Sequence, residues 1–187
     1  CFLCSNKIAP GHIRHLDYGE IKFGEYAANY NPVGITDRMQ FLKEDFENAG
    51  IKIELTEDLS KARWEKLVWN IPYNGLSVVL EATTDELMAD IYTRKLVEQL
   101  MHEVVAGAES NGRIIDENFI QKMISRTIKM KPYSTSMKID YDQNRPLEIE
   151  AIFGKPLRKA QEKGVNLPQI QCLYQQLKFL DARKQLM

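Results

Sequence analysis

The chain has 187 residues, of which 44% are hydrophobic and 27% are charged, so it is long enough to bury a sizeable core. Its 25 basic and 26 acidic side chains leave a net charge of −1 and form no basic stripe, which argues against nucleic acid as a partner. The sequence contains no apolar run of transmembrane length and opens with no signal-peptide pattern, so we expect a cytoplasmic protein without a membrane partner.

The cysteine and histidine patterns give weak signals for metal or redox chemistry. The three cysteines are an odd, low count, which argues against a disulfide framework and suits a reducing compartment. Cys1 and Cys4 have the C-x-x-C spacing, but no second pair follows and the run is as apolar as a buried strand. His12 and His15 alternate within a strand-like stretch. We therefore expect no metal site.

The first 57 residues mix strand and helix signals. Residues 12–17 and 20–25 are predicted to form a β-hairpin, with Tyr18 and Gly19 supplying the turn. Residues 36–50 predict a helix with Thr36 as N-cap, followed by a short strand over residues 51–55. The order strand, helix, strand resembles the closing part of an open α/β sheet. The chain begins with Cys inside an apolar segment, so we expect it to be a piece of a longer protein.

From Thr56 onward the strand signals stop and helical periodicity takes over. Thr83 and Glu86 form a capping-box pattern, Asp116 is placed as an N-cap, and Pro168 suits a first helical turn. We expect a mainly α chain, with a small α/β piece followed by an all-helical domain. The helices are predicted within residues 56–70, 83–92, 93–112, 116–130, 147–164 and 167–185.

One of these segments carries a polar stripe through an apolar run. Lys66, Asn70 and Asn74 are spaced by four residues and would share one helix face. Pro72 and Gly75 lie between and behind them, and are predicted to kink or break the helix. Apolar neighbours crowd the same segment, so we expect the stripe to border the core. The pattern alone leaves two interpretations open, a functional site and a solvated helix face before a loop.

A second polar segment spans residues 133–154. Hydroxyl side chains precede Met137, a polar loop is predicted to follow, and Glu148 and Glu150 open a helix. Carboxylates at a helix N-terminus are stabilised by the helix dipole, so an ordinary cap has the same appearance. By itself this segment is a weak signal for function.

Together the two segments resemble the ketopantoate reductase family, also called 2-dehydropantoate 2-reductase. Residues 64–74 read W-x-K-L-x-x-N-x-x-x-N. Some seventy residues later come S-M at 136–137, a polar loop with an arginine, and E-I-E-x-I-x-G over 148–154. The two blocks match the family in residue type and spacing, and the resemblance covers nearly the whole chain.

The resemblance implies a fold and an activity. Family members join an N-terminal Rossmann-type NADPH domain to a helical C-terminal domain of the 6-phosphogluconate-dehydrogenase type. Residues 1–57 would be the tail of the cofactor domain and residues 58–187 the substrate-binding domain. The family reduces ketopantoate to pantoate on the way to pantothenate and coenzyme A. The ten glycines here never form G-x-G-x-x-G, so the resemblance places the pyrophosphate loop outside these residues, and the chain alone should be inactive.

The resemblance also assigns site residues. Lys66 matches the catalytic lysine, whose ammonium can stabilise and then protonate the oxygen of a ketone under reduction. Asn70, Asn74 and Ser136 match residues that hold the substrate, a small 2-keto acid. Glu148 matches a cleft glutamate that contacts substrate or cofactor, and its carboxylate is able to pair with the lysine.

Two departures from the family pattern keep alternatives open. Thr84 stands where some members carry a substrate-binding asparagine, and a hydroxyl replaces an amide only in part. Pro156 stands where the family usually continues a helix, so a kink is expected there. One alternative is a reductase of the same fold acting on another 2-keto acid. The other is a helical domain that serves mainly in subunit association, and a homodimer is open on either interpretation.

Overall fold

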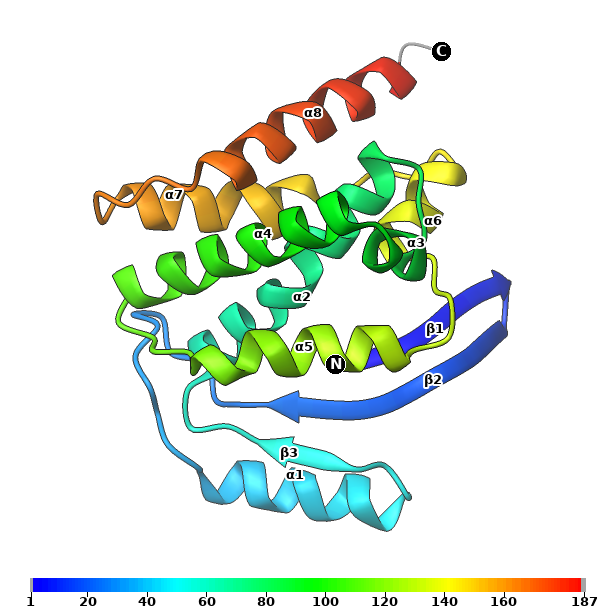
Figure 1. Cartoon of the computed structure of the whole chain (residues 1–187). Helices are drawn as coiled ribbons and strands as arrows, with labels where there is room; N and C mark the ends of the chain where they lie inside the picture. The colour runs from blue at the N-terminus through cyan, green and yellow to red at the C-terminus, as the bar shows by residue number, and fades with distance from the viewer. Residues whose placement is uncertain (1, 186–187) are drawn as a thin grey trace. The chain divides into compact units, whose positions relative to one another are not determined.

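In a computed structural model of the chain, the structure describes residues 2–185. The chain divides into two compact units, Cys1–Arg63 and Trp64–Met187, and Figure 1 labels the elements of each. The fold is mainly α, as predicted, and the described strands all lie in the first unit. Among the described residues, none of the helices combines the length and apolarity needed to cross a membrane.

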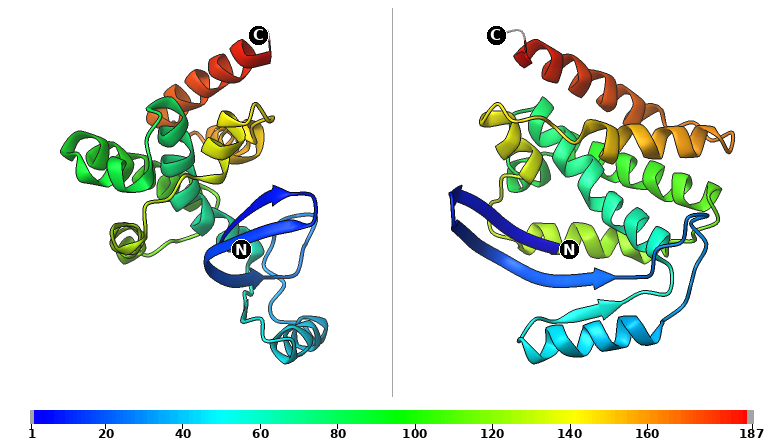
Figure 2. Two further views of the ribbon diagram at one scale, coloured as in Figure 1. Left: turned by 90° about the vertical axis from the view of Figure 1, so that its right-hand side faces the viewer. Right: turned by 180° about the vertical axis from the view of Figure 1, so that it is seen from behind.

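The first unit is a small sheet with one helix. Its elements are β1 (Phe2–Ala9), β2 (His12–Phe23), α1 (Asp37–Asn48) and β3 (Ile53–Leu55). β2 pairs antiparallel with β1 and parallel with β3, and α1, which connects β2 to β3, lies against β3 (Figure 2). A parallel pair needs such a crossover connection. The predicted order of strand, helix and strand is therefore confirmed.

The predicted turn at Tyr18 and Gly19 is wrong. β2 runs through both residues without interruption, and Tyr18 pairs with Leu3 of β1. The turn of the hairpin lies at Pro10 and Gly11 instead, where Gly11 has φ +73°, a backbone conformation that a residue without Cβ adopts at little cost. Phe2 pairs with Glu20 and Leu3 with Tyr18, so the register skips Gly19, and the local signal marks an irregularity within the strand in place of a turn.

α1 begins and ends as its sequence predicts. The Thr36 hydroxyl accepts a hydrogen bond from the backbone N–H of Met39 at 3.3 Å, which confirms Thr36 as the N-cap. Met39 is buried, whereas Phe41, Leu42 and Phe46 on the same helix are exposed. The apolar face of α1 is thus only partly covered within the described residues.

The second unit is helical and is built around α2 (Leu59–Val79), which begins just before the boundary between the units. Residues 71–78 of α2 are all buried, and Figure 2 shows α2 passing between the other helices of this unit. α4 (Ile91–Ser110) contacts both α7 (Lys155–Gln161) and α8 (Pro168–Gln185). The other elements are α3 (Thr84–Ala89), α5 (Glu117–Lys129), α6 (Ser136–Asp142) and the π-helical turn η1 (Glu150–Gly154).

Three predicted helix-start signals in this unit are confirmed, whereas α4 begins at Ile91, two residues before its predicted start. Asp116 accepts a hydrogen bond from the backbone N–H of Asn118 at 2.7 Å and caps α5. The Glu86 carboxylate accepts from the backbone N–H of Thr83 at 2.7 Å and from its hydroxyl at 2.8 Å. Pro168 is the first residue of α8. These bonds satisfy donors that a helix start leaves unpaired.

The helix was predicted to kink or break at Pro72, and a break does not occur, because α2 continues to Val79. Gly75 has a packing role instead. A Cβ at Gly75 would lie 2.4 Å from Cδ2 of Leu173 and 3.1 Å from the ring of Phe153. Glycine therefore allows α8 to approach the backbone of α2 closely, and this burial holds the proline-containing helix together.

Residues 130–160 contain two features that the sequence did not predict, α6 and a π-helical turn. A polar loop does follow Met137, but it begins only at Gln143, because Ser136–Asp142 form α6, which buries Met137 and Tyr141. At the expected kink, the helix widens into η1, where the N–H of Lys155 bonds to the carbonyl of Glu150, five residues earlier. Pro156 has no N–H to continue the regular ladder, which accounts for a π-turn at this place.

Tyr73 is a fully buried side chain at the centre of α2. Its hydroxyl donates to Sδ of Met88 at 3.1 Å, and its ring centroid lies 4.9 Å from that of Trp69. Burial raises the pKa of Tyr73 to about 12, because the phenolate would lose its hydration.

Replacing Gly75 by Ala should lower the free energy of unfolding by about 1–3 kcal/mol, because the new methyl group overlaps Leu173. Urea unfolding of the chain, followed by circular dichroism, measures this change. The double variant Gly75→Ala/Leu173→Ala is the control: it should cost less than the sum of the single changes, because truncating Leu173 removes the overlap. Strict additivity would contradict the packing role of Gly75.

Tyr73 should make stability fall at alkaline pH. An unfolded tyrosine ionises near its ordinary pKa of about 10, whereas folded Tyr73 ionises near 12. The stability that this difference provides is complete below pH 10 and is lost as the pH rises to 12. The decline of the unfolding free energy over this interval should be shallower in Tyr73→Phe than in the unchanged chain. Equal slopes for the two proteins would show that Tyr73 is not desolvated.

Candidate active site

Three of the predicted site residues lie on one face of α2. Because α2 is unbroken, the spacing of four residues aligns Lys66, Asn70 and Asn74 along the helix. Lys66 is exposed, Asn70 is half-buried, and Asn74 is only 2% exposed. The stripe therefore runs from solvent into the core, as its apolar surroundings indicate.

Asn74 has an unsatisfied acceptor. Its side-chain oxygen Oδ1 is buried and has no hydrogen-bond partner within residues 2–185. A buried polar atom without a partner costs about 1–3 kcal/mol, so most are paired. The exceptions invite an explanation, and one explanation is a ligand that donates a hydrogen bond to this oxygen.

The other predicted site residues lie where helices begin. Thr84 is the first residue of α3 and is 1% exposed, and its backbone N–H donates to the carbonyl of Tyr133 at 3.2 Å. Ser136 is the first residue of α6 and is exposed. Glu148 is also exposed, and its carbonyl accepts from the N–H of Ile152 at 3.0 Å as the helix begins.

Lys66 and Glu148 do not pair in this structure. Both side chains are exposed, and no ion pair joins them in the part of the chain that is described. The convergence of both groups on a single substrate remains a prediction.

Two buried hydroxyl groups that the sequence interpretation missed connect these elements. Oγ of Ser77 on α2 lies 2.7 Å from Oγ1 of Thr135, the N-cap of α6, and both residues are 0% exposed. Ser77 follows Asn74 by three residues, and Thr135 directly precedes Ser136. The two hydroxyls lie 58 positions apart in the sequence, so no local signal could have identified their contact.

Glu150 ties the turn after Glu148 to α8. Its carboxylate accepts from the hydroxyl of Tyr174 at 2.7 Å and from Arg158 at 3.0 Å, and Lys178 lies 3.5 Å away. The hydrogen bond from Tyr174, and then that from Arg158, lowers the pKa of Glu150. This cluster is a structural anchor on the exposed side of the helix that Glu148 precedes.

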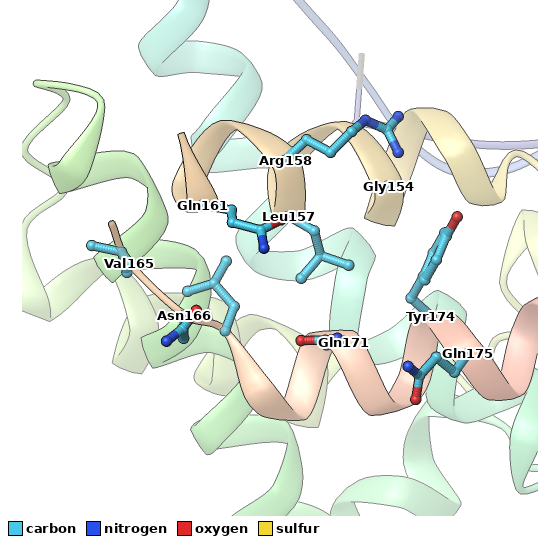
Figure 3. Close-up of a pocket in the computed structure, with 10 residues that line it drawn as sticks. Gly154, Leu157, Arg158, Gln161, Val165, Asn166, Gln171, Tyr174 and Gln175 are labelled. Carbon is cyan, nitrogen blue, oxygen red and sulfur yellow. The ribbon is translucent and has the colours of Figure 1, made fainter. Parts of the chain in front are cut away.

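A pocket lies between α7 and α8, next to this cluster (Figure 3). Tyr174 points from α8 toward Gly154, and the rest of the lining is rich in carboxamide side chains. Its lining includes none of the six predicted site residues. The pocket is therefore separate from the polar stripe of α2.

The described residues offer no metal site. Within them, no three His, Cys, Asp or Glu side chains gather closely enough to hold a metal ion. His12 and His15 both lie in β2. Cys1 and the side chain of Cys4 lie outside the described part of the chain, and Cys172 is a free, exposed cysteine.

Comparison with known proteins identifies close relatives. Over 183 residues the chain is 71% identical to the 2-dehydropantoate 2-reductase of Nostoc sp. (strain PCC 7120), a match that covers 98% of this chain and 57% of that protein. The crystal structure of 2-dehydropantoate 2-reductase from Geobacter metallireducens is 40% identical with a TM-score of 0.89, covering 95% of this chain and 58% of that one. The chain thus spans a little over half the length of these relatives.

The fold extends to a more distant enzyme. D-mandelate dehydrogenase, solved with NADH and anilino(oxo)acetate, has a TM-score of 0.84 at 17% identity, which shows a shared fold only; the match covers 98% of this chain and 59% of that one. Residues 58–181 match the family described as "Ketopantoate reductase PanE/ApbA C terminal". The predicted resemblance is confirmed, and the chain belongs to the ketopantoate reductase family.

Proposed function

We propose that this chain is part of an NADPH-dependent 2-dehydropantoate 2-reductase, which reduces the 2-keto group of ketopantoate to the alcohol of pantoate for pantothenate and coenzyme A synthesis. The 71% identical Nostoc relative supports this assignment. The observation that carries it is the polar stripe of α2, which ends in the buried, unpaired oxygen of Asn74. A hydroxyl group of the substrate could donate to this oxygen.

The two parts of the chain would have different roles in this reductase. Residues 1–57 would be the end of the cofactor domain, and residues 58–187 the substrate-binding domain. The sheet and crossover helix of the first unit, and the helices of the second, are compatible with these roles. The same proposal includes a cytoplasmic location and leaves a homodimer open.

Lys66 is the proposed general acid. When bound, NADPH supplies a hydride to the 2-keto carbon. Negative charge then develops on the oxygen, where the Lys66 ammonium stabilises it and donates a proton. Asn70, Asn74 and Ser136 hold the substrate so that its keto oxygen faces the lysine.

Few residues of this chain suit the cofactor itself. The sequence contains no G-x-G-x-x-G, so no glycine-rich loop is present here to hold a pyrophosphate. The exposed carboxylate of Glu148 fits a hydrogen bond to a hydroxyl of the cofactor or the substrate. We propose that NADPH is held mainly by residues outside this chain, with Glu148 at the edge of its site.

Thr84 favours one alternative, a reductase for a different 2-keto acid. Thr84 is almost fully buried, so its short side chain cannot reach as far as the asparagine of some family members. D-mandelate dehydrogenase was solved with anilino(oxo)acetate on the same fold. Comparing turnover of ketopantoate with that of other 2-keto acids by the intact protein distinguishes the two substrates.

Substituting Lys66 by Ala should lower kcat of the intact reductase by about 10²–10⁴-fold, because the proton donor is lost. The kcat of the variant is measured from the steady-state rate of NADPH oxidation. Lys61→Ala, which removes another lysine of α2 on a different face, is the matched control and should leave kcat unchanged. Turnover of Lys66→Ala within a few-fold of the unchanged enzyme would overturn the role of Lys66.

Replacing Asn74 by Leu should separate binding from stability. The change removes a buried, unpaired acceptor, so the free energy of unfolding of the chain should rise by about 1 kcal/mol. In the intact enzyme, KM for ketopantoate should rise at least about tenfold, because a substrate hydrogen bond is lost.

Asn111→Leu is the control for Asn74. The Asn111 amide donates to the carbonyl of Gly107 at 2.9 Å, so this change should lower stability and leave KM unaffected. If Asn74→Leu behaves in the same way as Asn111→Leu, Asn74 has a structural role and does not bind substrate.

A further inference from the structure

Three hydrogen bonds form a continuous chain from α6 to α2. The backbone N–H of Lys138 donates to Oγ1 of Thr135 at 3.2 Å, and this hydroxyl lies 2.7 Å from Oγ of Ser77. The Ser77 hydroxyl donates to the backbone carbonyl of Asn74 at 3.2 Å. The chain thus begins in the first turn of α6 and ends at a predicted substrate-binding residue.

The direction of these bonds follows from counting protons. A hydroxyl has one proton to donate. Ser77 uses its proton on the carbonyl of Asn74, so the proton between the two hydroxyls comes from Thr135. Thr135 in turn accepts from Lys138. Every donor in the chain has an acceptor, and because both hydroxyls are fully buried, breaking one link would leave a polar group unpaired.

A second contact fixes the segment that leads into α6. The backbone N–H of Thr84 at the start of α3 donates to the carbonyl of Tyr133 at 3.2 Å. Residues 133–135 are therefore bound to α3 at one end and to α2 at the other. A shift of the first turn of α6 relative to α2 would break buried hydrogen bonds.

We propose that Ser77 and Thr135 are positioning residues for the 2-keto acid site: their hydroxyl pair sets the distance between Asn74 and Ser136. This inference rests on the proposed function, because it takes these two residues as substrate contacts. Ser136 is exposed at the first position of α6, directly after Thr135, so the hydroxyl pair determines where its side chain begins. Binding groups lose much of their effect when displaced by about 1 Å.

Steady-state kinetics of the intact reductase test the proposal. Ser77→Ala should raise KM for ketopantoate about tenfold, the value of one hydrogen bond, with kcat changed by less than about threefold. Thr135→Ser keeps the hydroxyl, so the KM of this variant should stay within about twofold of that of the unchanged enzyme. An unchanged KM in Ser77→Ala would overturn the proposal.

Thr127→Val is the matched control for general loss of stability. Thr127 is a buried hydroxyl that accepts from Nε1 of Trp69 at 3.0 Å and donates to the carbonyl of Met123 at 2.9 Å. Removing this hydroxyl in Thr127→Val should lower the melting temperature as much as Ser77→Ala does, but should leave KM unchanged. A KM increase in Thr127→Val equal to that in Ser77→Ala would show that destabilisation alone explains the effect.

The most specific test asks whether the effect of Ser77→Ala on KM depends on the presence of the Ser136 hydroxyl. In a Ser136→Ala background, Ser77→Ala should change KM by less than about twofold, because the group that it positions is already absent. The same increase in both backgrounds would overturn positioning of Ser136.

Lys66→Ala, measured in the same series, separates this inference from the proposed function. Loss of turnover in Lys66→Ala together with an unchanged KM in Ser77→Ala would overturn the positioning role alone. Retained turnover in Lys66→Ala would overturn the proposed function.

Discussion

The helical unit depends on α2 remaining helical while its second half is completely buried. Residues 71–78 lie in the core although they include a proline, a glycine and two polar side chains. Tertiary packing compensates for the weak helix propensity of this segment, since α8 and η1 approach Gly75 so closely that a Cβ there would force Leu173 to shift. The packing leaves little room for adjustment, so a polar group on this part of α2 is either paired within the fold or left without a partner.

The polar groups of α2 fall into these two classes. Ser77 is fully paired, through Thr135 and the carbonyl of Asn74. The side-chain oxygen of Asn74, one turn earlier, has no partner within the described residues. Buried polar groups that the fold leaves unsatisfied reduce stability, and proteins retain them where activity requires them. The same helix therefore contributes a rigid scaffold at Ser77 and an available acceptor at Asn74.

Local signals in the sequence predicted the helices well. Thr36, Asp116 and the Thr83–Glu86 capping box were identified because each helix start is satisfied by side chains close by in the sequence. The strand through Gly19 and the continuous helix through Pro72 were mispredicted for a common reason. In both places, partners distant in the sequence override the local preference: β1 pairs with β2, and α8 packs on α2.

In the candidate site too, residues close together in the sequence were predicted, whereas contacts between distant residues were missed. The spacing of Lys66, Asn70 and Asn74 was sufficient to place them on one helix face, and the motifs identified the family. The link between Ser77 and Thr135 joins residues 58 positions apart, so no local pattern predicts it. The short helix α6 was also missed, because seven residues carry little periodicity.

The most direct test is a crystal structure of the intact protein with a bound 2-hydroxy acid product. The account predicts a ligand hydroxyl within about 3 Å of Oδ1 of Asn74, with the Lys66 ammonium within hydrogen-bond reach of the oxygen at the former keto carbon. A product bound elsewhere, with a water molecule occupying the acceptor position at Asn74, would contradict it.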